Sequence, residues 1–333
     1  MMIGSHDLVQ NLPATARALG LASLQVRRED LNGIGIGGTK SRTMQRALAA
    51  AARRGASILV LPARAGSNAV VAACVLAKGS DLKLHAVLRP QPGSQAACRN
   101  LGLIHASGCA ISPVGLDVSL RRNGPFLNRL AERLQQAGER AEFLSFGAAT
   151  IEAGLAHFSA FMDLAAQFRL AGTPRPDRIY MAAASFDSGA GVLAGIATAG
   201  WPTTLVLVNV AQDAVPSPAC VLGRAQQVLQ LTGTSGPAGP ANVPARLLQL
   251  RDQLAPGFGQ IDPAALDQLT ALGLPFALDP SYTAKAALAL LDDARQGAVR
   301  QPMLWYGSPD TAQLDVAARN CAVPSGLADA LLL

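Results

Sequence analysis

The chain has 333 residues, of which 50% are hydrophobic, enough for a sizeable core in one large α/β domain or in two compact lobes. A net charge of +6 raises the question of nucleic acid. However, the arginines are scattered along the chain, and no basic run alternates with aromatic residues, which make up only 4%. We therefore expect no nucleic-acid partner.

The five cysteines are widely spaced and form no CxxC pair or cluster with histidine, a pattern typical of a reducing cytoplasm without structural zinc. The first residues, MMIGSHDLVQ, lack the basic and apolar regions of a secretory signal. No apolar stretch reaches the ~20 residues that a membrane span needs. We predict a cytoplasmic protein with no membrane partner and no metal site.

Short β-rich segments alternate with alanine-rich helical segments along the chain. The predicted strands are 57–62, 84–90, 142–146, 178–184, 203–210 and 302–306, and the main predicted helices are 41–54, 67–78, 120–137 and 151–170. Continuous apolar strands with helical crossovers are typical of parallel sheets covered on both faces. We therefore predict an α/β fold, in which ligands bind beyond the carboxyl ends of the strands.

The stretch GIGIGGTKSR, residues 33–42, places Lys40 just after a run of glycines, with only Thr39 between them. Glycine lets the main chain approach a ligand closely. The spacing does not fit a P-loop, which has four residues between its first glycine and its Gly-Lys-Ser/Thr end. From these residues alone, Lys40 could serve a phosphate, bind a cofactor, or be an ordinary charge at the start of a helix.

Three strand-to-helix turns are further candidates for a binding site. LPARAGSNAVV contains Ser67 and Asn68, AAASFDSGAGVLAGI contains a loop over 186–191, and LWYGSPD follows the last predicted strand. A glycine-rich turn at a helix N-terminus presents unpaired N–H groups to a phosphate. Each turn also has a purely structural explanation, because Ser67 or Asn68 could serve only as an N-cap and small residues could only shorten a loop.

The order of these motifs resembles one family. VRREDLNGIGIGGTKSR, residues 26–42, is similar to the Lys-Arg-Glu-Asp-Leu…Gly-Gly-Asn-Lys-x-Arg segment of the pyridoxal-phosphate enzymes that include D-cysteine desulfhydrase and aminocyclopropane-carboxylate deaminase. Ser67-Asn68 matches the family's Ser-Asn, 189–195 matches its glycine-rich loop, and DPSYTAKA, 279–286, matches Asp-Pro-Val-Tyr-Thr-Gly-Lys-Ala. The family's late His-Thr-Gly-Gly turn falls on the eroded 307–310.

This resemblance implies a fold-type II architecture of two lobes, each with a mostly parallel sheet flanked by helices. A small lobe over 43–147 would be inserted into a large cofactor-binding lobe formed by 1–42 and 148–333. The family also implies pyridoxal 5'-phosphate as cofactor, a small amino-acid-like substrate and a homodimer. Its chemistry implies β-elimination, deamination or replacement on a modified amino acid, here within specialised biosynthesis.

The resemblance assigns roles by position. Lys40 would bind the cofactor aldehyde through its amine and later move protons at the substrate carbon. Asn68 would hydrogen-bond the ring oxygen, and Ser67 would face the substrate carboxylate or the leaving group. Tyr282 would pack near the ring or act as an acid or base, and Ser308 would meet the pyridine nitrogen. The amides that would hold the phosphate are those of Ser188, Gly189, Ala190 and Gly191.

Several positions depart from the family pattern. Thr283 stands where the deaminases have an acidic residue, and Ser308 is neutral, so we expect a less protonated ring that favours elimination over ring opening. Ala69 and Val71 replace polar residues expected near the substrate carboxylate, which predicts a preference for larger or less polar β-substituted substrates over free D-cysteine. Asp187 adds a negative charge close to where the phosphate should bind.

Two alternatives stay open. A degenerate relative could bind the cofactor or a protein partner without turnover, which the eroded loops favour and the retained Lys40 opposes. A dinucleotide-binding oxidoreductase is disfavoured, because no strand leads into a GxGxxG turn with an acidic residue ~20 positions later.

Overall fold

The computed structural model describes residues 8–211, 217–234 and 242–333. The chain divides into two compact units, each with its own sheet. The first unit comprises Met1–Gly33 and Gly154–Ser308, and the second comprises Ile34–Ala153 and Pro309–Leu333. The lobe boundaries expected from the sequence, between residues 42 and 43 and between 147 and 148, stay a prediction.

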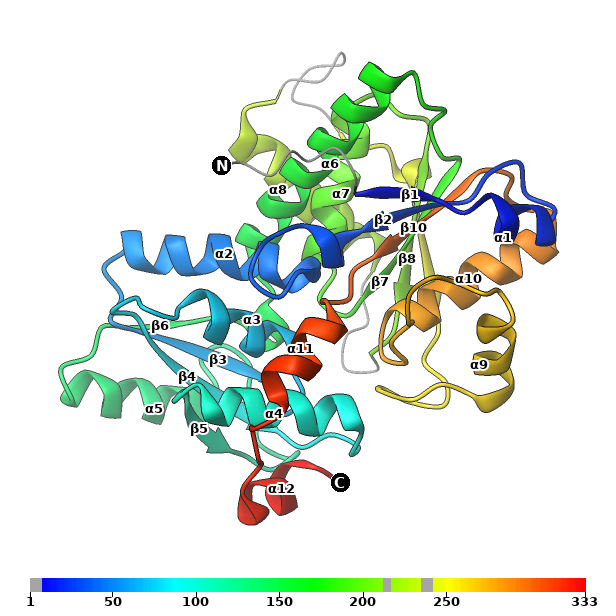
Figure 1. Ribbon diagram of the computed structural model, residues 1–333. Helices are drawn as coiled ribbons and strands as arrows, with labels where there is room; N and C mark the ends of the chain where they lie inside the picture. The colour runs from blue at the N-terminus through cyan, green and yellow to red at the C-terminus, as the bar shows by residue number, and fades with distance from the viewer. Residues whose placement is uncertain (1–7, 212–216, 235–241) are drawn as a thin grey trace. The chain divides into compact units, whose positions relative to one another are not determined.

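The first unit is built on a six-stranded sheet with the order β1, β2, β10, β7, β8, β9 (Figure 1). Its strands are β1 (Val9–Asn11), β2 (Gln25–Arg28), β7 (Arg178–Ala183), β8 (Thr204–Asn209), β9 (Leu248–Asp252) and β10 (Pro302–Tyr306). β1 runs antiparallel to β2, and the other neighbouring strands of this sheet are parallel. The long apolar runs of β7, β8 and β10 form its buried centre, as expected for a parallel sheet covered on both faces.

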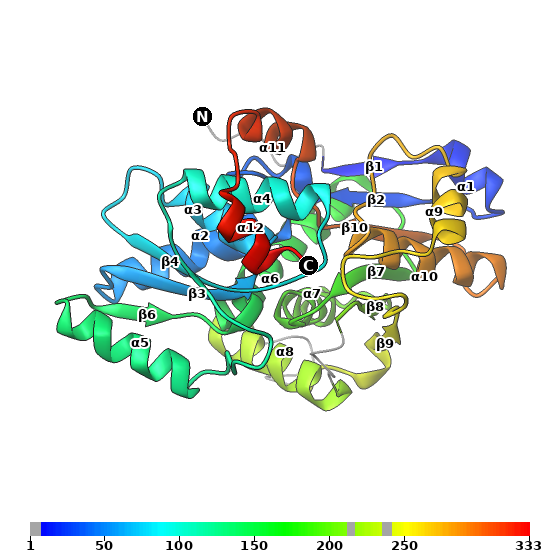
Figure 2. The same ribbon diagram turned by 90° about the horizontal axis from the view of Figure 1, so that it is seen from below.

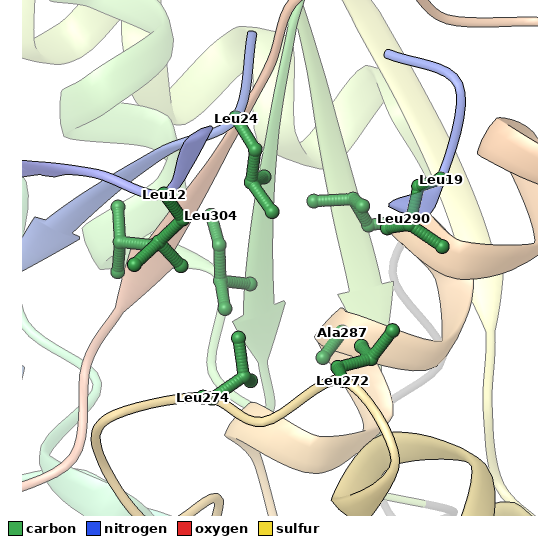
Figure 3. A pocket seen from close by; sticks show the side chains of 9 residues that line it. Leu12, Leu19, Leu24, Leu272, Leu274, Ala287, Leu290 and Leu304 are labelled. Atoms are coloured by element: carbon green, nitrogen blue, oxygen red, sulfur yellow. The ribbon is translucent and has the colours of Figure 1, made fainter. Parts of the chain in front are cut away.

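Helices cover both faces of this sheet (Figures 1 and 2). One face carries α1 (Pro13–Ala18), α9 (Pro263–Thr270) and α10 (Thr283–Arg295), and the other carries α6 (Ile151–Ala171), α7 (Asp187–Thr198) and α8 (Pro218–Thr232). Two short 3₁₀ turns, η2 (Glu29–Leu31) and η4 (Ala245–Leu247), follow β2 and precede β9. A small recess beside α1 and α10 is lined by apolar side chains alone, so it does not suit a phosphate (Figure 3).

The second unit has a parallel four-stranded sheet with the order β5, β4, β3, β6. The strands are β3 (Ile58–Arg64), β4 (Lys83–Arg89), β5 (Ala110–Pro113) and β6 (Ala141–Phe143). The helices α2 (Gly38–Arg53), α3 (Asn68–Leu76) and α4 (Gln95–Ala106) cover one face, and α5 (Pro125–Gln136) covers the other (Figure 2). The turn η3 (Phe146–Ala148) follows β6, and α11 (Thr311–Ala318) and α12 (Ser325–Leu331) complete the unit.

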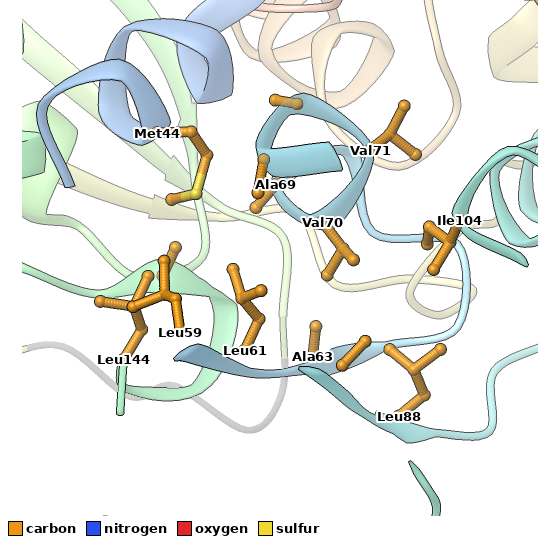
Figure 4. Close-up of a cluster of buried hydrophobic side chains, with 14 of the residues drawn as sticks. Met44, Leu59, Leu61, Ala63, Ala69, Val70, Val71, Leu88, Ile104 and Leu144 are labelled. Atoms are coloured by element: carbon orange, nitrogen blue, oxygen red, sulfur yellow. The ribbon is translucent and has the colours of Figure 1, made fainter. Parts of the chain in front are cut away.

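The main core of the second unit lies between its sheet and α2 and α3 (Figure 4). Met44, Leu59 and Val70 are buried there. Ala69 and Val71 belong to the same core and are only 3% and 0% exposed. Packing therefore explains why these two positions are apolar, and they do not support the expectation that lost substrate contacts select larger substrates.

The predicted α/β fold, with mostly parallel sheets flanked by helices, is confirmed. Among the described residues, no helix combines the length and apolarity that crossing a bilayer requires.

Candidate functional site

Lys40 lies in the first turn of α2, two positions after a pair of glycines with left-handed backbone. Gly37 and Gly38 have φ of 70° and 78°, a conformation that costs glycine little and other residues much more. The half-buried Lys40 donates a hydrogen bond from Nζ to the carbonyl of Gly147, 2.8 Å away. The glycine run thus fixes where α2 begins, and the amine faces polar backbone of η3 within the same unit.

Ser67 and Asn68 begin α3 at the carboxyl end of β3. Ser67 occupies the N-cap position, but its side chain makes no capping hydrogen bond, so capping does not explain this serine. Asn68 Oδ1 accepts a hydrogen bond of 2.8 Å from Nδ2 of Asn100, which is 2% exposed. Asn100 Nδ2 also donates to the carbonyl of Gly66 at 2.9 Å.

These hydrogen bonds determine where the oxygen and the nitrogen of each side-chain amide lie. A carbonyl oxygen can only accept, so the Gly66 carbonyl requires the amino group of Asn100 to face it. Asn100 in turn requires the oxygen of Asn68 to face Asn100. The other end of the Asn68 amide is therefore its Nδ2, a donor suited to a ligand oxygen.

Gly66 allows α4 to approach this turn. A Cβ at position 66 would lie 2.8 Å from Cα of Ala97, which is closer than real Cβ atoms come. The Gly66 amide donates to Oε1 of Gln91 at 3.0 Å. Any side chain at this position would therefore collide with the backbone of α4.

The glycine-containing turn after β7 opens α7, following Phe186 in a left-handed conformation (φ 62°). Ala190 donates its amide to the Phe186 carbonyl at 2.8 Å and so makes the first intrahelical bond. The amides of Ser188 and Gly189 precede this bond and are positioned to bind an anion at the positive end of the helix. Of the predicted phosphate donors, Ala190 already donates its amide within the helix, which leaves the amides of Ser188 and Gly189 as candidates.

Gly191 has a packing role in α7. A Cβ at this position would lie 2.1 Å from the carbonyl oxygen of Gly154 in α6. Its amide also falls inside the helix, beyond the first turn where amides lack intrahelical partners. Close contact between two helix backbones therefore explains this glycine without a phosphate.

Asp187 is the negative charge that the sequence places beside the proposed phosphate position. Its carboxylate is only 4% exposed and pairs with Arg224 of α8 through a 3.2 Å contact. An arginine at this distance offsets the negative charge of the carboxylate. The repulsion expected from the sequence is therefore reduced by a residue 37 positions further along the chain.

Ser308 follows β10 and is 4% exposed. Its hydroxyl donates to Oδ2 of Asp279. Thr283 Oγ1 donates to the same atom at 2.6 Å and accepts from the Asp279 amide at 2.9 Å. Asp279 also accepts from the amides of Tyr282 and Thr283 at 2.8 and 3.1 Å, at the start of α10. Sequence reasoning quoted Asp279 within a motif but gave it no role.

Tyr282 is half-buried beside Phe258, with ring centroids 5.7 Å apart in an edge-to-face arrangement. Lys285 lies within the same helix start, is 1% exposed, and donates from Nζ to the carbonyl of Gly257 at 2.7 Å. Burial lowers the pKa of Lys285. Lys285 provides a second amine that an aldehyde could react with. In this structure its amine instead hydrogen-bonds the loop that carries Phe258.

The Arg-Glu-Asp part of the first motif is structural. Arg27 and Glu29 form a fully buried ion pair at 3.0 Å, and Arg28 pairs with Asp30 at 2.6 Å. These pairs join the end of β2 to η2. They hold the chain just before the glycine run.

The predicted site residues fall into two groups, one in each unit. Lys40, Ser67 and Asn68 lie in the second unit, and Ser188, Gly189, Tyr282 and Ser308 lie in the first. The second unit offers an amine and a side-chain amide donor, and the first offers helix-start amides and a buried hydroxyl. Each of these groups has a chemical counterpart in pyridoxal phosphate, which carries an aldehyde, a ring oxygen, a phosphate and a ring nitrogen. Within the described residues, no three metal-ligating side chains cluster.

Comparison with solved structures defines the class of fold. A crystal structure of a protein described as an ACC deaminase homologue superposes with a TM-score of 0.74, covering 95% of each chain at 22% identity. The fold is that of the fold-type II enzymes. No family model matches the sequence.

Sequence relatives then place the chain more narrowly. It is 27% identical to a D-cysteine desulfhydrase of Yersinia enterocolitica over 305 residues, which cover 89% of this chain and 88% of the relative. It is 35% identical to a nocardicin C-9' epimerase of Nocardia uniformis over 213 residues, 64% of either chain, so this match spans a little under two thirds of the epimerase. The similarity to the desulfhydrase and deaminase family that the motifs predict is confirmed.

Proposed function

We propose that this protein is a pyridoxal-phosphate-dependent enzyme that acts on a modified amino acid by β-elimination, deamination or replacement. The observation that carries this proposal is the amine of Lys40 at a helix start that two left-handed glycines create. The similarity to a D-cysteine desulfhydrase over 89% of the chain supports it.

The cofactor, when bound, would supply an aldehyde and an electron-withdrawing ring. Lys40 would hold it through Nζ and move a proton at the substrate's α-carbon. Asn68 would donate from Nδ2 to the ring oxygen, because Asn100 occupies its Oδ1. Ser188 and Gly189 would bind the phosphate through their amides.

Ser67 and Tyr282 complete the proposed site. Ser67 has no capping role, which supports a role toward the substrate carboxylate or leaving group. Tyr282 would pack on the ring or move a proton. We also propose a cytoplasmic homodimer with a small amino-acid-like substrate, and a small lobe over 43–147, as the family resemblance implies.

The test begins with an absorption spectrum of the purified protein, before and after borohydride. A visible chromophore that borohydride removes is expected for an enzyme or for a degenerate cofactor-binding relative, and it is not expected for a dinucleotide-binding oxidoreductase. Release of ammonia or a 2-oxo acid from a panel of D- and L-amino acids with graded β-leaving groups then separates an enzyme from a relative without turnover.

Epimerisation at the α-carbon is a second candidate, favoured by the 35% identity to a nocardicin C-9' epimerase. Such a reaction removes and returns one proton and needs no leaving group. In deuterated water it would place deuterium at the α-carbon without releasing ammonia. Elimination or deamination would release ammonia, so one panel of amino acids distinguishes the two reactions.

A further inference from the structure

The hydrogen bonds around Ser308 determine what its hydroxyl can offer to a ligand. A serine hydroxyl carries one proton, and once that proton is donated the oxygen can only accept. Three acceptors lie close to it: the Asp279 carboxylate, Thr283 Oγ1 at 3.3 Å and the hydroxyl of Tyr306. The carboxylate is the nearest of the measured partners and carries the negative charge, so it takes the proton.

The proton of Thr283 is directed to Asp279 as well. Thr283 Oγ1 accepts from the Asp279 amide and donates to Asp279 Oδ2 at 2.6 Å. Two backbone amides at the start of α10 also donate to the Asp279 carboxylate. The carboxylate therefore accepts hydrogen bonds from two hydroxyls and two amides. Thr283 Oγ1 already accepts from the Asp279 amide, whereas the Ser308 oxygen keeps its lone pairs for another donor.

The other polar groups near Ser308 do not change the direction of its hydrogen bond to Asp279. The Tyr306 hydroxyl donates to the Ala277 carbonyl at 2.7 Å. Burial, with the nearby carboxylates of Asp30 and Asp279, raises the pKa of Tyr306, so the phenol stays neutral and protonated. Arg28 lies over the rings of Phe276 and Tyr306 but is paired with Asp30.

We propose that Asp279 fixes Ser308 as a hydrogen-bond acceptor and thereby holds a proton on the ring nitrogen of bound pyridoxal phosphate. The inference rests on the proposed function and on the position at that nitrogen that the family resemblance implies for Ser308. A ring N–H donates to Ser308 Oγ, and Ser308 donates to Asp279. Asp279 acts through another residue and is a positioning residue.

This arrangement revises the expectation drawn from a neutral Ser308 and from Thr283. The acidic group is present, but it lies behind the serine instead of directly after Tyr282. A protonated ring withdraws electrons more strongly than a neutral one. Reactions that form a carbanion without expelling a leaving group, such as epimerisation, are therefore accessible to this site.

The test is nuclear magnetic resonance of the full-length protein loaded with pyridoxal 5'-phosphate that carries ¹⁵N in the ring. At pH 7.5 we expect the ¹⁵N shift of a protonated ring in the wild-type protein. Asp279→Ala should abolish it, because the serine loses its carboxylate acceptor and can donate its proton to the ring nitrogen. Ser308→Ala removes the acceptor and should also abolish it.

A matched variant separates protonation from packing. Thr283→Val removes one hydroxyl from Asp279 but keeps the Asp279–Ser308 bond, so the ring should stay protonated. Circular dichroism and the stoichiometry of bound cofactor establish that each variant is folded and loaded. If Asp279→Ala does not fold, the ¹⁵N shifts of the wild-type protein and of Ser308→Ala still test the inference.

The outcomes are distinct. A wild-type protein that binds no labelled cofactor overturns both the proposed function and this inference. A bound but unprotonated ring in the wild-type protein overturns the inference alone. Protonation that persists in folded, loaded Asp279→Ala, or in Ser308→Ala, shows that these residues do not hold the proton and also overturns it.

Discussion

Asn100 and Asn68 lie 32 positions apart, and the 2.8 Å hydrogen bond between them sets the direction of the Asn68 amide. The Gly66 carbonyl can only accept a hydrogen bond, so it fixes the orientation of the Asn100 amide. The donor end of Asn68 is thus determined by a residue of α4 that carries no recognised motif.

Substitution of Asn100 tests this relationship. Asn100→Ala removes the constraint and should weaken pyridoxal-phosphate binding roughly tenfold, the effect of about one lost hydrogen bond. Asn100→Asp should weaken it further, because a carboxylate attracts the amino group of Asn68 and turns its oxygen toward the ligand. Titration of the cofactor-free protein measures both. The exposed Asn128→Asp is the control, and equal affinity of Asn100→Asp and the wild type would contradict the assignment.

Lys40 is one of only four lysines, with Lys78, Lys83 and Lys285, so its assignment can be tested completely. After borohydride treatment we expect the cofactor on the peptide that contains Lys40 and none on protein carrying Lys40→Ala. Lys83→Ala, at an exposed lysine paired with Glu139, is the control and should keep the adduct. A reduced adduct on Lys285 would show that the buried amine is the one that binds.

Arg224 should influence cofactor affinity without touching the cofactor. Arg224→Met leaves the buried Asp187 carboxylate without this partner beside the proposed phosphate position. Because Arg224 is 53% exposed, solvent screening limits the effect, and we expect about a three- to tenfold loss of affinity. The double variant Asp187→Asn with Arg224→Met should recover most of it. Unchanged affinity in Arg224→Met would mean that the phosphate binds elsewhere.

Polar residues at positions 69 and 71 should lower the stability of the protein and should not improve substrate binding. Ala69→Gln or Val71→Lys places a polar group in the core of the second unit, where both native residues are buried. We expect a loss of about 2–4 kcal/mol in the free energy of unfolding, measured by urea denaturation. Lys78→Gln, on the exposed surface near the end of the same helix, should leave it unchanged. A folded Ala69→Gln with improved turnover of D-cysteine would instead place position 69 at the substrate.

His85 should make the second unit sensitive to mild acid. Burial on β4 and the nearby Arg133 lower its pKa in the folded state, so below its ordinary value near 6.5 the unfolded chain binds more protons. The contribution of His85 is therefore present above pH ~6.5 and is lost as pH falls toward the folded pKa. We expect the difference in urea midpoint between pH 7.5 and 5.5 to shrink in His85→Gln. The exposed His105→Gln should behave like the wild type, and an equal difference in all three proteins would contradict this view.

The sequence predicted the long apolar strands of both sheets and the short edge strand β6, and it missed the other short strands. The residues of β8 and β10 form apolar runs long enough to be recognised. The short β2, QVRR, was not recognised because its buried Arg27 is tolerated only through Glu29, a tertiary pairing that no local pattern reveals. The edge strand β9, LQLRD, is similarly short and partly polar.

The candidate site shows the same division. Lys40 and Asn68 were predicted because they sit inside recognisable motifs. Their supporting residues were missed, since Asn100 and Arg224 reach the site from other helices and have no distinctive neighbours in the sequence. For Asp279 a signal existed, because an acidic residue just before a helix start is a natural partner for its amides.

The close approach of α7 to its neighbours has a consequence for how this helix is stabilised. Gly189, Gly191 and Gly195 each lower the intrinsic stability of the helix by about 1 kcal/mol relative to alanine. Their missing side chains are what allow Leu207, the Gly154 carbonyl and Phe161 to come close. A segment this poor in helix propensity gains its stability from neighbours that are already in place. The proposed phosphate position at the start of α7 is therefore stable only within the assembled unit.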